Sequence, residues 1–166
     1  MLHYSATSSS FISRTENIRA HHRANVAFYD RRAKVRFSPQ EGTAATEGLC
    51  LVISCTPSDW QLSPLAQVCS SSFPSLSTVE HLKIFSYRSH WKGDIENTQW
   101  LGLLHPFTDV TNPVLSRRSP PLVAPALQEL AGINVTEVLP VLQNLHLGLK
   151  QSKRVKEAIR QFIAAR

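Results

Sequence analysis

The spacing of apolar residues recurs along this chain at a nearly fixed interval, and that recurrence constrains the fold more than any other feature. One copy consists of Leu76, Val79, Leu82 and Ile84. A shift of 31 residues gives Phe107, Val110, Pro113 and Leu115, and a further shift of 32 gives Leu139, Leu142, Leu145 and Leu147. An upstream shift of 33 gives Leu49 and Leu51, followed by Ile53. A period of this length is typical of stacked structural repeats.

Except at Pro113, the three complete copies have the form apolar-x-x-apolar-x-x-apolar-x-apolar, which is the core spacing of leucine-rich repeats, and the upstream copy supplies the last two positions. The final two-residue step suits a strand, because alternate strand residues point to the same face. One unit does not bury its apolar face alone, whereas stacked neighbours do. We therefore predict an α/β fold, a leucine-rich-repeat-like solenoid fragment in which parallel strands alternate with helices.

The segments between the predicted strands have helical spacing. The first carries Leu62, Leu65, Ala66 and Cys69, and the second carries Ile95, Trp100, Leu101, Leu103, Leu104 and Phe107, with Asp94 as a candidate cap. A third predicted helix has Ser119 as its cap and Pro120 in its first turn. The last segment, capped by Ser152, is the clearest amphipathic helix, with Val155, Ala158, Ile159, Phe162 and Ile163 on one side.

The chain divides into two parts on this interpretation. Residues 1–24 are expected to be a partly disordered or irregular N-terminal segment, and residues 25–166 a degenerate leucine-rich-repeat-like α/β domain. Near its start, two short stretches alternate as strands, and they form either an earlier degenerate repeat or a hairpin that closes the end. They contain Val26 and Phe28, then Val35 and Phe37. Pro113 removes a ladder donor from a core strand position, so we expect the third strand to be short or broken there.

Composition narrows the class of protein. With 42% apolar and 18% charged residues among 166, the chain is globular and not disordered. No apolar run approaches the roughly 20 residues of a membrane span, and the first residues show no secretory signal. Cys50, Cys55 and Cys69 are expected to be reduced, mostly buried thiols in a cytoplasmic or nuclear protein.

Catalytic signatures are missing from the sequence. There is no HExxH, no GxSxG, no phosphate-binding glycine loop and no paired His, Asp and Cys spacing. We therefore predict no enzyme activity, no cofactor and no metal site. Trp100 is assigned to the core, and Trp91 lies in a loop as the more exposed anchor for a partner.

The residues between the core leucines should face outward on a curved sheet and form the partner-binding surface. They are Cys50 and Val52, His81, Lys83 and Phe85, Val114 and Ser116, and Asn144 and His146. This set is mixed and has no dominant charge, which favours contact with an unknown protein over contact with nucleic acid.

The net charge of +6 supports an alternative function, a basic protein that associates with nucleic acid. That function would depend on Arg31, Arg32, Lys34 and Arg36. These charges alternate with apolar residues as on a solvated strand face, and the sequence shows no aromatic interleaving typical of a nucleic-acid module. Nucleic acid is therefore the less favoured partner.

Four strings carry a resemblance to a known family: DWQLSPLAQVCSSSFPSLSTVEHLKI, IENTQWLGLLHPFTDV, APALQEL and TEVLPVLQNLHL. They resemble the C-terminal leucine-rich-repeat-like region of F-box-type proteins of mushroom-forming (basidiomycete) fungi. The resemblance covers about residues 49–166, and residues 11–48 more loosely. It implies the substrate-recognition part of a ubiquitin-ligase receptor, in which the F-box would hold a Skp1-type adaptor and the repeats a target.

The sequence departs from that family in two places. No F-box precedes the repeats, so binding of the adaptor is not carried over to any residue, and Pro113 stands where the family has leucine. A truncated or degenerate gene product without independent function is a further alternative, because a solenoid without capping repeats exposes apolar faces.

Overall fold

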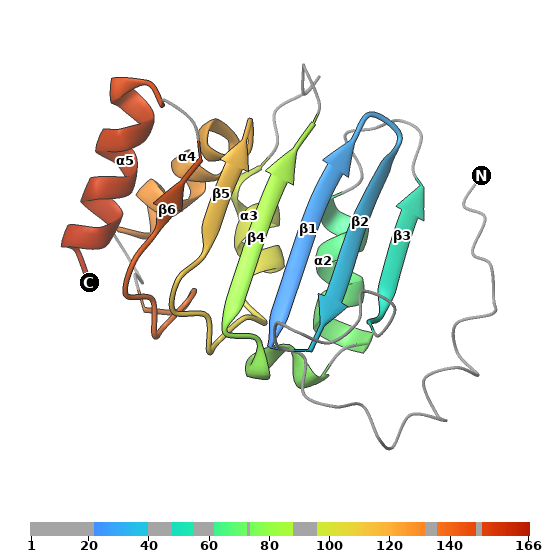
Figure 1. Ribbon diagram of the computed structural model, residues 1–166. Helices are drawn as coiled ribbons and strands as arrows, with labels where there is room; N and C mark the ends of the chain where they lie inside the picture. The colour runs from blue at the N-terminus through green and yellow to red at the C-terminus, as the bar shows by residue number, and fades with distance from the viewer. Residues whose placement is uncertain are drawn as a thin grey trace.

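A computed structural model describes residues 22–39, 48–54, 62–72, 74–87, 96–131, 136–148 and 151–166. They form a six-stranded sheet with the order β3-β2-β1-β4-β5-β6 (Figure 1). The strands are β1 (Arg23–Tyr29), β2 (Arg32–Ser38), β3 (Cys50–Ser54), β4 (His81–Ser86), β5 (Val114–Arg117) and β6 (His146–Leu147). The helices are α2 (Leu62–Ser72), the 3-10 helix η2 (Pro74–Thr78), α3 (Asn97–Leu104), α4 (Pro120–Leu130) and α5 (Lys153–Ala164).

The sheet is mixed, which confirms the α/β class but corrects the expectation that all strands are parallel. β1, β4, β5 and β6 run parallel to one another, whereas β1 pairs antiparallel with β2 and β2 pairs antiparallel with β3. Asp30 and Arg31 form the turn between β1 and β2, since Tyr29 pairs with Arg32. Antiparallel neighbours need only such a short turn, while parallel neighbours need a crossover.

The segment with Leu49 and Leu51 does not stack on β4 as a first repeat. It forms β3 at the edge of the sheet, and β1 occupies the place beside β4. The spacing of 33 residues at this point is therefore not a structural repeat. The two alternating stretches near the N-terminus are confirmed as strands β1 and β2, in the hairpin arrangement. β1 begins at Arg23, so the sheet takes in the last two residues of segment 1–24.

The helices form a layer behind the sheet. α2 packs against α3, α3 against α4, and α4 against α5. In Figure 1, α2, α3 and α4 lie on the far side of the strands. Trp100 of α3 meets Phe28 of β1 edge to face, with the ring centroids 5.5 Å apart, a favoured aromatic geometry. Trp100 is 1% exposed, which confirms its assignment to the core.

The repeated apolar positions do line this core. In the first two copies all of the residues are buried: Leu76, Val79, Leu82 and Ile84, then Phe107, Val110, Pro113 and Leu115. In the last copy Leu139 is buried, and Leu142, Leu145 and Leu147 pack against the core while partly exposed. Equivalent positions are also joined, because the Asn144 side-chain amide donates to the Asn112 side chain, 32 residues earlier, at 3.0 Å.

Pro113 limits the third parallel strand as expected. β5 begins immediately after it and has four residues, against six in β4. Proline has no amide hydrogen to donate to the ladder, but the Pro113 carbonyl accepts a hydrogen bond from the His146 amide at 2.9 Å. The residue therefore still joins β5 to β6 through its one remaining backbone polar group.

The predicted starts of α4 and α5 are confirmed, because Ser119 and Ser152 directly precede these helices. The Ser152 hydroxyl accepts from the Val155 amide at the start of α5, as predicted. Leu62, Leu65, Ala66 and Cys69 are the buried face of α2. α3 begins after Glu96, and the candidate cap Asp94 lies outside the described residues. On α5, Ile163 is 38% exposed and does not join the buried face.

Ser119 occupies the predicted N-cap position before Pro120, but its side chain does not cap α4, which corrects that part of the prediction. Its backbone is already helical and its hydroxyl makes no capping bond. The hydroxyl instead lies 2.9 Å from the carbonyls of Ile84 on β4 and Ser116 on β5, and the residue is fully buried. The Ser119 side chain therefore links the start of α4 to the strands β4 and β5.

Replacing Ser119 tests this role. Ser119→Ala should lower the free energy of unfolding by about 1–2 kcal/mol, because buried carbonyl groups lose their hydroxyl donor. Ser119→Asp should be more destabilising, since it buries a carboxylate against carbonyl oxygens. Urea unfolding followed by circular dichroism measures both. Ser70→Ala, at an exposed position on α2, is the control and should be nearly neutral; equal effects at the two serines would contradict the assignment.

Candidate binding surface

The sheet has a face that no described helix covers, and this face is turned toward the viewer in Figure 1. Side chains alternate along each strand, so the residues between the buried ones point to it. Val52 is 49% exposed and Tyr87, directly after β4, is 45% exposed. We call this the open face. Its strand positions are Arg23, Asn25, Ala27 and Tyr29; Arg32, Lys34, Arg36 and Ser38; Cys50, Val52 and Ser54; His81, Lys83 and Phe85; Val114 and Ser116; and His146.

The predicted partner-binding residues on strands all lie on the open face. Cys50 and Val52 are on β3, His81, Lys83 and Phe85 on β4, Val114 and Ser116 on β5, and His146 on β6. Asn144 lies just before β6, and Trp91 lies outside the described residues. The set is not contiguous, however, because β2 and β1 separate the β3 residues from those of β4.

The intervening strands β2 and β1 add residues to the open face that were not in the predicted partner-binding set. The strand register aligns them in rows across the sheet. Arg36, Asn25 and Lys83 form one row over β2, β1 and β4. Lys34, Ala27 and Phe85 form the next row, in which the alanine is the shortest side chain. Side chains in one row are close enough to act on one ligand, since adjacent strands lie about 4.8 Å apart.

These rows make the open face cationic, which corrects the expectation of a mixed surface without dominant charge. Its fixed positive charges are Arg23, Arg32, Lys34, Arg36 and Lys83. Among the described strand positions that point to this face, none is Asp or Glu. Glu80 immediately precedes β4, and its Oε1 atom lies 3.4 Å from Nδ1 of His22. The charge is concentrated over β2, β1 and β4, whereas the open-face positions of β5 and β6 carry no fixed charge.

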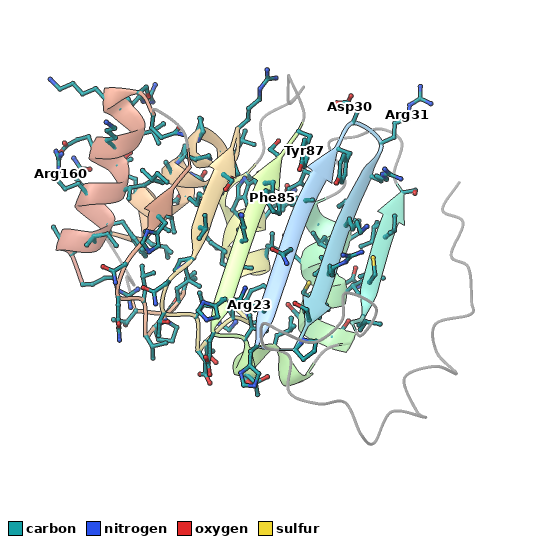
Figure 2. All side chains as sticks on the ribbon, in the orientation of Figure 1. Arg23, Asp30, Arg31, Phe85, Tyr87 and Arg160 are labelled. Atoms are coloured by element: carbon teal, nitrogen blue, oxygen red, sulfur yellow. The ribbon has the colours of Figure 1, made fainter. Side chains whose placement is uncertain are left out.

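Aromatic side chains are interleaved with these cations, although no local sequence pattern predicts it. Tyr29 of β1 stacks on Tyr87, with ring centroids 4.9 Å apart and planes 4° from parallel. The ring of Phe85 lies 6.2 Å from Tyr87, and both residues are labelled on the open face in Figure 2. The Arg32 guanidinium is 5.0 Å from the centre of the Tyr29 ring, and the Lys83 ammonium is 5.2 Å from that of Phe85. Such contacts stabilise a cation by about 0.5–1 kcal/mol at exposed sites.

Among the described residues, no group of three His, Cys, Asp or Glu side chains is placed to hold a metal ion. Burial raises the pKa of the Cys69 thiol to about 12, so this thiol stays protonated in the core. Cys50 is exposed on β3, contrary to the expectation that the cysteines are mostly buried. What the open face offers a ligand is positive charge, amide and hydroxyl groups, and aromatic rings.

Neither a protein-family model, nor a curated protein, nor a solved structure matches the chain. In the part of the chain that the structure describes, no helix is long and apolar enough to cross a bilayer. The resemblance to F-box-type proteins therefore stays a prediction.

Thiol labelling tests the exposure of the open face. In a Cys55→Ser background, a maleimide at pH 7.5 should modify Cys50 in the folded protein at least about 100-fold faster than Cys69. Cys69 reacts slowly because it is buried and because its raised pKa suppresses the reactive thiolate. Peptide mass spectrometry after timed quenching measures the two rates. In 6 M guanidinium chloride the difference should disappear; equal rates in the folded protein would contradict the assigned burial.

Proposed function

We propose that this chain is a non-catalytic protein-binding module and that the open face of its sheet is the partner-binding surface. The observation that carries the proposal is a side-by-side array of charged, aromatic and small side chains on hydrogen-bonded strands, with no described helix over it. Rigid strands hold such groups in place before binding, so little conformational entropy is lost when a partner docks. Arginine and tyrosine are also the residue types enriched at energetically important interface positions.

We extend the proposal to a leucine-rich-repeat-like arrangement of β4, β5 and β6, which supports the same function. β4, β5 and β6 follow one another in chain order, are parallel, and are connected through α3 and α4. Repeats of this kind stack into curved sheets whose strand face binds partners. The solenoid interpretation applies to this C-terminal half of the sheet, where the spacing of 31 and 32 residues coincides with successive strands.

The family resemblance narrows the proposal to the substrate-recognition part of a ubiquitin-ligase receptor of the cytoplasm or nucleus. In that role the open face holds a protein target. The proposal assigns no residue to a Skp1-type adaptor, because the sequence contains no F-box. Nucleic-acid binding is the second candidate, favoured by the cationic rows of β2, β1 and β4.

Site-specific photo-crosslinking tests the proposed surface. A photo-reactive amino acid at Ser116, on the open face, should crosslink one reproducible protein in cells of the source organism. The same amino acid at Gln128, exposed on the helix α4, should not. The captured protein is then purified, and its binding to the chain should weaken at least about tenfold when Val114→Arg crowds the open face.

Two results would reject the proposal. Equal crosslinking from Ser116 and Gln128 would show that the open face is not the interface. Recovery of nucleic acid alone from Ser116 would favour the second candidate. The Val114→Arg variant is checked by circular dichroism, and Gln128→Arg is its matched control, which should leave binding within twofold.

A further inference from the structure

Beyond the location of the surface, the charges on it indicate the chemistry of what binds there. We propose that the partner docks through an extended, acidic peptide segment that lies over β2, β1 and β4, with its carboxylates paired to Lys34, Arg36 and Lys83. This inference rests on the proposed function, because it names the chemical class of the partner at that same surface.

The cations on β2 have a spacing that suits an extended peptide. Arg32, Lys34 and Arg36 are alternate residues of one strand and point to the same face. Two residues along a strand span about 6.6 Å. An extended peptide that runs along β2 has the same period, so every second side chain meets a cation. Arginine pairs with a carboxylate through two parallel hydrogen bonds.

The charges extend across the strands as well as along them. Lys83 lies two strands from Arg36 in the same row, with Asn25 between them. The Asn25 amide adds neutral hydrogen-bonding capacity to a row that is otherwise cationic. Neighbouring cations on β2 are about 6.6 Å apart, within the distance of about 8 Å over which charges act together at physiological salt. Lys83 lies about 9.6 Å from Arg36, across β1, and extends this positive field at low salt. An acidic segment therefore meets a positive field over three strands and relieves the repulsion between like charges on the free surface.

The contacts of the aromatic rings favour carboxylates over nucleic-acid bases. Base stacking needs a ring whose flat face is available. The Tyr29 ring is contacted by both Tyr87 and the Arg32 guanidinium, and the Phe85 ring is contacted by the Lys83 ammonium. The rings are thus engaged in positioning the cations. Two of the three rings, Tyr29 and Phe85, therefore already contact a cation. The charged groups of β2 and β4 are the groups of this surface that a carboxylate can pair with.

Fluorescence polarisation with the purified full-length chain tests the inference. The probe is a labelled ten-residue peptide with Glu at alternate positions, compared with the same peptide carrying Gln instead. At low salt the Glu peptide should bind measurably, and the Gln peptide at least about tenfold more weakly. The double substitution Lys34→Glu and Arg36→Glu should weaken binding of the Glu peptide by about tenfold or more, since it replaces attraction with repulsion at two sites.

The matched control is the double substitution Arg154→Glu and Lys156→Glu. It changes the net charge equally at exposed positions of α5, and it should change binding by less than twofold. If the β2 double variant fails the circular dichroism check of folding, Lys34→Gln with Arg36→Gln replaces it, with an expected loss of about threefold. Equal losses from the β2 and α5 variants would overturn the inference, because net charge alone would then explain binding.

A labelled ten-residue oligothymidine provides the remaining arm. Tighter binding of this probe than of the Glu peptide, abolished by the β2 substitutions, would overturn the inference in favour of single-stranded nucleic acid. Failure of the Glu peptide to bind, while the Ser116 crosslink to a protein persists, would reject the acidic segment and leave the protein-binding surface intact. Failure of both experiments would reject both proposals.

Discussion

The parallel pairing of β1 with β4 is the interaction on which the rest of the structure depends. It joins an antiparallel meander, β1 to β3, to the parallel strands β4 to β6 through a continuous register from Arg23–His81 to Phe28–Ser86. Under the same pair, Phe28 meets Trp100 and connects the sheet to α3. Without this pairing, each half would have an unpaired strand edge and a core open at one side.

The same pairing creates the surface to which we assign the function. It brings Tyr29 onto Tyr87 and places the cations of β2 on the same face as Lys83, with β1 between them. The helices cover the other face, so the apolar residues of each strand are committed to the core and the alternate residues remain available. Packing of the helices on one side of the sheet therefore leaves the open face on the other.

Local sequence patterns predicted the strands and helices, but they did not predict which strands are neighbours in the sheet. The period of two identified β1, β2, β4 and β5, the shortening at Pro113 followed from its missing amide, and the helical stripe placed Trp100 in the core. The neighbour of β4 was not predictable in this way, because Leu49 and Leu51 satisfy the apolar spacing equally well while lying at the sheet edge. The aromatic interleaving was missed for the same reason, since Tyr29 and Tyr87 meet only through the β1–β4 pairing.

The division of the open face into a charged and an uncharged part bears on selectivity. Charge alone attracts any polyanion, and the attraction weakens with salt. Next to the Lys83 row, however, the register continues onto Val114 and then His146, and next to Phe85 it continues onto Ser116. A partner that covers both parts must place acidic groups over β2, β1 and β4, and small or apolar groups over β5. A partner that lacks the acidic groups leaves a desolvated cation without a counter-charge, and a partner that lacks the apolar groups loses the contact over β5. The charged and uncharged parts together therefore discriminate between partners that charge alone would not separate.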